Sequence, residues 1–383
     1  MKVETMRVCV AVAVLQSISF LGYPQTGQRL TPPFFVNQPF TQSSPFNIEL
    51  PKNPQLDPNS SAIITALNSM SNATWGLPAG TTGWVLELAA TPSKRDFTYP
   101  VYFSTYSDPV YTIDCNGCTL QGIQINIPSY SVPENDSADC TSGDHHIAII
   151  NPAYAEYDMW EACPPNGRGG TFKIGYGGYG HPYGPYEDMG ITTDTMAYGG
   201  GQSGFAEELG GVRAVDISQG AMIPHALQMQ IPCAGNTNTA NPYRLNPVWP
   251  AQNVPTDQAC SNDFQHPPFY GMRVQLNMTD AQIQALHLPA YATSVLLTLE
   301  HYGAFVSDTG TGGDMQFVTE SGLTYTQLGL TDPWVTLAQQ NGIQPTNGVT
   351  DNGDYTAYLF TIAAPGLTQH LRVIAPCVTW GTC

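Results

Sequence analysis

The chain has 383 residues with 30 acidic and 12 basic side chains, which gives a net charge of −18 at pH 7. A surface this acidic repels phosphate backbones and anionic membranes, which argues against a nucleic-acid-binding or membrane-inserted protein. Only 11% of the residues are charged, whereas Gly and Pro number 37 and 32. That composition favours many short strands joined by turns over a helical protein.

The N-terminus predicts export. A short basic segment precedes an apolar run from Val8 to about Gly22, which is typical of a signal peptide at residues 1–24. The run is too short to span a bilayer. Residues 25–58 follow as a Pro-rich extended leader, and we expect a secreted protein with a single domain at 59–383.

Cysteine usage agrees with an oxidising compartment. Cys9 lies in the predicted signal peptide, and the spacing of the remaining cysteines favours pairs that are close in sequence. The Cys-x-x-Cys segment has no second segment of its kind, which argues against a zinc site. The expected disulfides are Cys115–Cys118, Cys140–Cys163, Cys233–Cys260 and Cys377–Cys383.

Strand patterns outnumber helical ones along the chain. Helical spacing of apolar residues predicts helices at 59–70, 280–286, 289–302 and 333–340. Strand patterns lie at 84–88, 99–103, 119–127, 220–231, 270–276, 304–306, 356–363 and 371–380. The predicted fold is mainly β, an antiparallel, jelly-roll-like β-sandwich with a few peripheral helices. Residues 321–383 belong either to the same sheets or to an appended flap.

The stretch at 143–162 predicts a β-hairpin that carries the candidate site. Its strands are 145–150 and 156–160, and side chains alternate between the two faces of each strand. If the loop holds five residues, His146 lies opposite Trp160, and Asp158 shares their face. A loop one residue shorter turns Asp158 to the far side, so the sequence leaves two registers open.

Other segments offer further candidates, each with two interpretations. The Gly/Tyr tract at 166–211, with Tyr176 and Tyr179, is either an ordered surface loop or the aromatic wall of a sugar cleft. His225 in an apolar strand is either a packed residue or a catalyst. Asp308, where a strand opens into a Gly turn, is either a turn former or a working carboxylate.

Several short motifs occur together between about residues 45 and 320. They are D-x-H at Asp144–His146, Y-D-x-W at Tyr157–Trp160, HAL at His225–Leu227 and YG-x4-D at Tyr302–Asp308. In these motifs the chain resembles an uncharacterised family of secreted β-sandwich proteins from actinobacteria and acidobacteria. The resemblance implies no reaction, but it implies that the polar residues of the motifs belong together. The family pattern has Glu where this chain has Asp158.

The first functional hypothesis is a secreted glycoside hydrolase that acts on an extracellular polysaccharide by carboxylate and His acid–base chemistry. The scarcity of Lys and Arg favours a neutral glycan, and hydrolysis over the lyase reaction. The candidate catalytic residues are Asp144, His146, Asp158, His225 and Asp308. The candidate substrate-binding residues are Trp160, Tyr176, Tyr179 and Tyr302.

Two other hypotheses stay open. The chain is a non-catalytic glycan-binding or matrix protein if its aromatic rings stack on sugars while the His and Asp residues only fix loops. It is a cupin-like metal enzyme if Asp144, His146 and His225 hold a divalent ion, since the D-x-H spacing places two ligands on one strand face.

Overall fold

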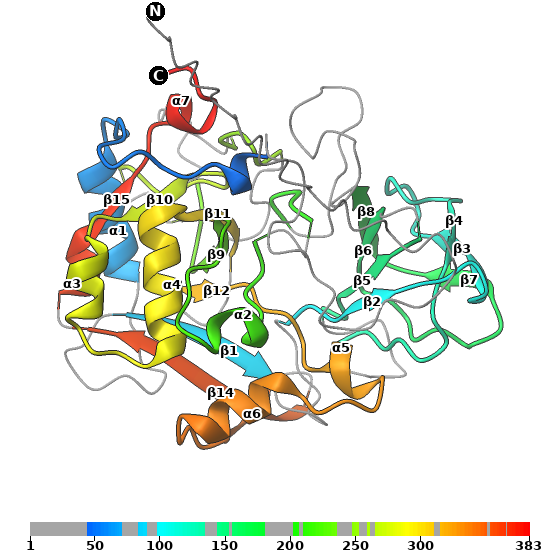
Figure 1. The fold of residues 1–383 in the computed structure, drawn as a ribbon. Helices are drawn as coiled ribbons and strands as arrows, with labels where there is room; N and C mark the ends of the chain where they lie inside the picture. Colours follow the sequence, from blue (N-terminus) through cyan, green and yellow to red (C-terminus); the bar gives the residue numbers. More distant parts are fainter. Residues whose placement is uncertain are drawn as a thin grey trace, which may run out of the picture.

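The computed structural model describes residues 44–70, 83–89, 98–134, 144–152, 155–180, 202–206, 210–235, 247–252, 259–260, 265–309, 315–350, 353–364 and 366–383. The predicted signal peptide lies outside these residues. Within them, the strands form one large sheet and two small ones, which lie on opposite sides of the molecule (Figure 1).

The large sheet has eight strands in the order β13-β14-β1-β12-β9-β11-β10-β15. Their bounds are β1 Gly83–Ala89, β9 Leu227–Ile231, β10 Arg273–Leu276, β11 Ala304–Thr309, β12 Gln316–Phe317, β13 Thr346–Thr350, β14 Gly353–Ala363 and β15 Leu371–Val373. The central strand β9 is buried on both faces: Leu227, Met229 and Ile231 enter the main core. By alternation, Gln228 and Gln230 lie on the opposite face.

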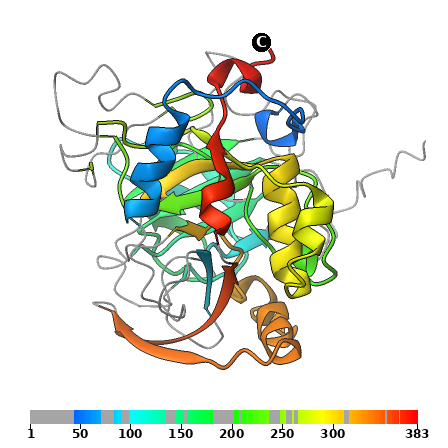
Figure 2. The same cartoon turned by 90° about the vertical axis from the view of Figure 1, so that its left-hand side faces the viewer.

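Helices pack against this sheet on the side away from the small sheets. Helix α1 (Ser60–Met70) packs on β15, and α4 (Ala290–His301) packs on β10 with α3 (Asp280–Gln284) beside it. Figure 2 shows α1 and the α3–α4 pair on either side of β15. The other helical segments are η1 Pro45–Asn47, α2 Ala214–Ile217, α5 Leu323–Thr326, α6 Pro333–Gln340, η2 Leu367–His370 and α7 Pro376–Thr379.

Local sequence determines where two of these helices begin. Thr279 and Gln282 form a capping box in which each side chain accepts from the other residue's backbone N–H, and this starts α3. The Asp332 carboxylate accepts from the backbone N–H of Trp334 and starts α6, with Pro333 at its first position. Such a cap stabilises a helix by about 1 kcal/mol.

The two small sheets pack face to face. One has the order β2-β5-β6-β8 and the other the order β4-β3-β7. They enclose a separate core to which Tyr111, Ile147, Met159 and Phe172 contribute. The bounds are β2 Val101–Phe103, β3 Val110–Asp114, β4 Gln124–Asn126, β5 Ile147–Ile150, β6 Glu156–Trp160, β7 Gly170–Lys173 and β8 Tyr176–Gly180.

The fold is sheet-rich with peripheral helices, as the composition predicts, but a jelly-roll sandwich is not confirmed. Among the described strands, four pairs run parallel: β1 with β12, β9 with β11, β2 with β5, and β3 with β7. Parallel neighbours need a crossover connection. Between β9 and β11 the chain passes through β10, α3 and α4.

Several predicted elements are confirmed and others are wrong. The helices at 59–70, 289–302 and 333–340 are present. The strand predicted at 371–380 stops at Val373, because Pro376 opens the short helix α7. In the strand predicted at 119–127, only Gln124–Asn126 is extended.

Part of the predicted leader packs against the domain. Phe46 is buried in the main core, and its carbonyl accepts from the backbone N–H of Ala226. Leu56 pairs with Ile374 in an isolated antiparallel bridge. Residues 44–58 therefore belong to the folded structure.

Three predicted disulfides are present, namely Cys115–Cys118, Cys233–Cys260 and Cys377–Cys383. Cys163 is also disulfide-bonded, and its predicted partner Cys140 lies outside the described residues. Among the helices of the described part of the chain, none has the length and apolar character needed to cross a membrane.

The Cys233–Cys260 disulfide closes the longest loop of the three, with a sequence separation of 27. Replacing both cysteines with Ala is expected to lower the free energy of unfolding by about 3 kcal/mol, because the unfolded chain regains the entropy of that loop. Urea denaturation measures the change. A stability equal to that of the wild type would show that the bond does not constrain the unfolded chain.

Candidate active site on the β5–β6 hairpin

The hairpin has the predicted register, with a loop of five residues, but its strand pairing begins at Ile147 and does not include His146. Strands β5 and β6 pair antiparallel, with Ile150 opposite Glu156 and Ala148 opposite Asp158, so the loop holds the five residues 151–155. Ile147, Ile149 and Met159 point into the small core. By alternation, Ala148, Glu156 and Asp158 lie on the other face of this sheet, which we call the hairpin face.

Small residues surround Asp158 on the hairpin face. Its neighbour on β5 is Ala148 and its neighbour on β8 is Gly178. The carboxylate is fully buried. Neither neighbouring strand presents a side chain longer than a methyl group at this position.

Three ligand-type side chains meet at the open end of the hairpin. Ligand atoms of Glu134, Asp144 and His146 all lie within 4.8 Å of one another. Glu134 and His146 are buried, and Asp144 is half-buried. His225, which the sequence grouped with Asp144 and His146 as a metal ligand, is not part of this group; Glu134 completes it.

Hydrogen bonds and ring contacts fix these three side chains. The indole N–H of Trp160 donates to Asp144 Oδ1 at 3.1 Å. The backbone N–H of Thr98 donates to Glu134 Oε2 at 3.0 Å. The ring of Tyr99 packs edge-on against the His146 imidazole, with 4.6 Å between centroids.

Residues that flank the two strands at this end have a left-handed backbone. His145 has a φ of 47° and Glu161 a φ of 49°, which only a few per cent of non-glycine residues adopt. Backbone N–H groups of Glu161 and Ala162 donate to the carbonyls of Asp144 and His145 and hold this geometry. Such strain concentrates at functional sites. Burial raises the pKa of Glu161, and the nearby Asp144 charge adds to the shift, while His145 opposes it.

Two of the predicted substrate-binding rings lie side by side. Trp160 and Tyr176 are paired residues on β6 and β8, and both are half-buried. Paired residues share a face, so Tyr176 lies on the hairpin face. Tyr179 does not: it pairs with Tyr157, and both rings pack against the small core.

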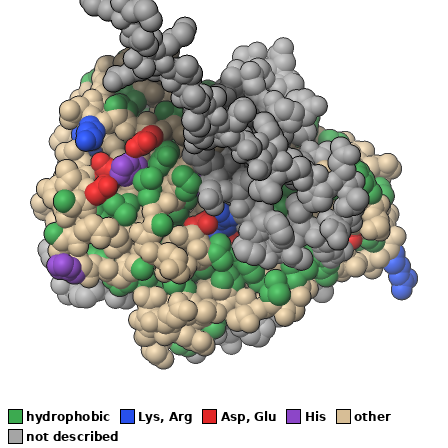
Figure 3. Space-filling view, viewed as in Figure 1, with side chains coloured by type: hydrophobic (Ala, Val, Ile, Leu, Met, Phe, Trp, Pro, Cys, Tyr) green, Lys and Arg blue, Asp and Glu red, His purple; other side chains and the backbone are tan. Residues whose placement is uncertain are grey.

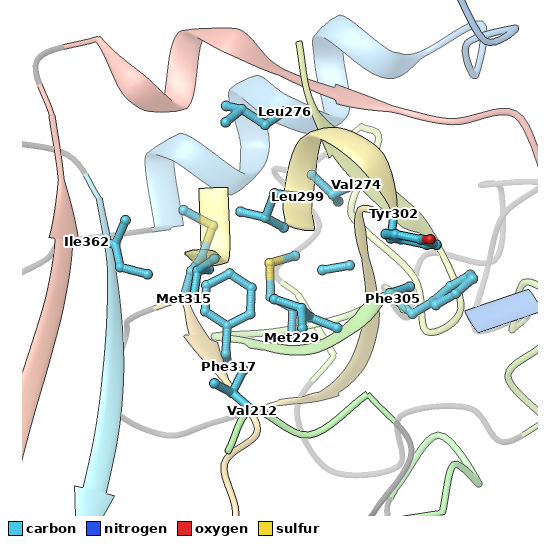
Figure 4. Close-up of a cluster of buried hydrophobic side chains, with 14 of the residues drawn as sticks. Val212, Met229, Val274, Leu276, Leu299, Tyr302, Phe305, Met315, Phe317 and Ile362 are labelled. Atoms are coloured by element: carbon cyan, nitrogen blue, oxygen red, sulfur yellow. The ribbon is translucent and has the colours of Figure 1, made fainter. Parts of the chain in front are cut away.

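Tyr302 lies away from the hairpin. It is the C-cap residue of α4 and packs in the main core, where it is drawn near Phe305 (Figure 4). Its carbonyl accepts from Arg273 Nε at 2.7 Å. These contacts give Tyr302 a structural role.

Asp308 is connected to the hairpin through two intervening side chains. It lies at a bulge in β11, beside Gln230 of β9. Gln230 Nε2 lies 3.5 Å from the Tyr99 hydroxyl, and Tyr99 contacts His146. The face of the large sheet that carries Gln230 is therefore linked to the hairpin face by Tyr99.

His225 lies in a different environment. It is buried, its Nδ1 lies 2.9 Å from the Ala226 carbonyl, and the ion pair of Arg213 and Asp216 is close enough to shift its pKa. Burial lowers the pKa of His225 to about 4; its hydrogen bond to Ala226 opposes the shift, and the Arg213 charge adds to it. The imidazole is therefore neutral at pH 7.

The lowered pKa of His225 predicts a loss of stability in acid. The unfolded chain takes up a proton near pH 6.5 and the folded chain only near pH 4, so stability falls by about 3 kcal/mol as pH drops through this window. His225→Asn keeps a donor near the Nδ1 position but does not titrate. Urea denaturation at several pH values should show that the free energy of unfolding of the variant rises relative to that of the wild type as the pH falls from 6.5 to 4. A difference in the free energy of unfolding that stays constant over this pH range would contradict the lowered pKa of His225.

Sequence reasoning missed Glu134, which lies in a segment of turn-forming residues. No periodicity marks it, and its place depends on a tertiary contact in which its backbone N–H donates to the His146 carbonyl. Comparison with protein-family models, curated proteins and solved structures finds no match for this chain.

Proposed function

We propose that the protein is a secreted carbohydrate-active enzyme that hydrolyses a neutral extracellular polysaccharide at the hairpin face. One observation supports the proposal: Asp158, Trp160 and Tyr176 share the hairpin face, and Glu134, Asp144 and His146 meet at the open end of the same hairpin. Aromatic rings stack on the apolar faces of sugars, and carboxylates transfer the protons that glycosidic cleavage needs.

The residues divide into two roles in this proposal. Trp160 and Tyr176 form the platform on which a sugar ring stacks. Asp158 transfers a proton, since it shares the hairpin face with the platform and lies next to Trp160 on that face of β6. Asp144 is held by Trp160, so it lies at the edge of the platform together with His146.

The test is incubation of the full mature chain with a panel of neutral polysaccharides that includes glucans, xylans and mannans. The expected result is a ladder of shortened oligosaccharides from at least one of them, with new reducing ends. Binding to a polysaccharide without any products would contradict hydrolysis.

A second candidate function is glycan binding without turnover. It is favoured by the complete burial of Asp158, which also suits a carboxylate that only fixes the structure. In that case Trp160→Ala should abolish retention on an insoluble polysaccharide, whereas Asp158→Asn should retain it. The same panel separates the two functions, because only the enzyme releases products.

A further inference from the structure

We infer that Glu134, Asp144 and His146 form a binding site for one divalent transition-metal ion, with Zn²⁺ as the best match. Their ligand atoms already lie within 4.8 Å of one another. Ligands of a tetrahedral zinc ion stand roughly 3.4 Å apart, as bond lengths near 2.1 Å require. Displacements of the ligand atoms by about 1 Å would close the group around an ion.

The donor set matches the chemistry of such an ion. Imidazole nitrogen suits zinc and other first-row metals, and carboxylate oxygen completes mixed N/O sites. Three protein ligands with a fourth position open is the arrangement of catalytic zinc sites. Two carboxylates this close, one of them fully buried, repel each other, and a divalent cation between them removes that repulsion.

The surroundings orient the ligands as metal sites require. Trp160 donates to Asp144 Oδ1, and the backbone N–H of Thr98 donates to Glu134 Oε2. Hydrogen bonds of this kind to metal-binding carboxylates fix their direction and strengthen binding. The three ligands come from two segments that are tied by the hydrogen bond from Glu134 N–H to the His146 carbonyl.

A second group of the same composition serves as a comparison within the same molecule. Asp280, Glu300 and His301 also lie within 4.8 Å of one another. Acidic side chains surround a histidine over the end of α4 in Figure 3. Here both ring nitrogens face carboxylates: Nδ1 lies 2.8 Å from Glu49, and Nε2 lies 3.0 Å from Asp280 and 2.8 Å from Glu300.

His301 lies in an ion-pair network in which both of its ring nitrogens face carboxylates. Burial alone would lower its pKa, but hydrogen bonds to Glu49 and Asp280 raise the pKa overall. A doubly protonated imidazole has no lone pair for a metal. His301 supplies a matched control, because it belongs to a group of the same composition at a different place in the fold.

The role of the ion rests on the proposed function, whereas its binding does not. Next to Trp160, the open coordination position would take a sugar hydroxyl or a water molecule. An ion there would lower the pKa of that water and polarise the bound sugar. The class of cofactor is thus a divalent first-row metal ion at the edge of the sugar platform.

The test measures metal on the full mature chain without any glycan. After treatment with a chelator and titration with Zn²⁺, calorimetry should give one site per chain, and saturation should raise the unfolding temperature. Glu134→Gln and His146→Asn should each weaken binding at least tenfold, whereas His301→Gln should leave it unchanged. Equal binding in all four proteins, or loss only in His301→Gln, would overturn the inference.

A second measurement needs no variant that might fail to fold. X-ray absorption of the zinc-loaded wild-type chain should show a shell of nitrogen and oxygen ligands with one imidazole. A shell without imidazole, or the absence of a stoichiometric site, would overturn the inference. If zinc binds as expected but no polysaccharide is cleaved, the metal site stands and the proposed glycan hydrolysis fails.

Discussion

Replacing Asp158 with Asn is expected to reduce glycan hydrolysis by about 10²- to 10⁴-fold, the usual contribution of a positioned proton-transfer group. The amide has nearly the same shape as the carboxylate, so it fits between Ala148 and Gly178 without a clash. It neither accepts nor releases a proton at neutral pH. The rate of reducing-end formation measures the loss.

The chain offers a close control for this substitution in Glu156. That residue lies on the same strand and face, is equally buried and stands two paired positions away, opposite Ile150. Glu156→Gln removes a buried carboxylate but is expected to keep activity. An Asp158→Asn variant that folds and keeps full activity would contradict the assignment, as would an equal loss in Glu156→Gln.

Replacing Glu320 with Gln is expected to remove a loss of stability of about 5 kcal/mol that the wild type undergoes between pH 4.5 and 8. Burial raises the pKa of Glu320 to about 8, against opposing effects of Arg213 and the Tyr325 hydroxyl. A carboxyl group whose pKa is raised on folding stabilises the protein fully below pH 4.5, its value when unfolded. That stability is lost as pH rises towards 8.

The comparison with wild type isolates this effect. His225 acts in the opposite direction between pH 4 and 6.5, but it is present in both proteins and cancels in the difference. Urea denaturation should show that the free energy of unfolding of Glu320→Gln rises steadily relative to that of the wild type from pH 4.5 to 8. A difference that does not vary with pH would show that Glu320 is ionised in the folded protein throughout.

The hairpin shows which features of this site can be predicted from the sequence. The alternation along 147–150 and 156–160 sets which side chains share a face once the loop length is known, and the loop holds five residues. The disulfides at Cys233–Cys260 and Cys377–Cys383 were predictable because both partners are close in the chain. Local patterns are enough for features of this kind.

Features that depend on distant contacts were not predictable. Glu134 joins Asp144 and His146 only because the chain folds back onto the hairpin. Tyr179 takes the opposite face from Tyr176 because the Gly/Tyr tract forms β8, where the sequence suggested either a loop or a wall of aromatic rings. The parallel pairing of β9 with β11 also requires knowledge of the whole path between them.

The most direct test of the hairpin face as the active site is a crystal structure of Asp158→Asn bound to an oligosaccharide of the polysaccharide that the wild type degrades. We expect a sugar ring stacked on Trp160 and Tyr176, with the scissile bond beside position 158. A sugar bound elsewhere on the protein, with both rings uncovered, would contradict the proposal.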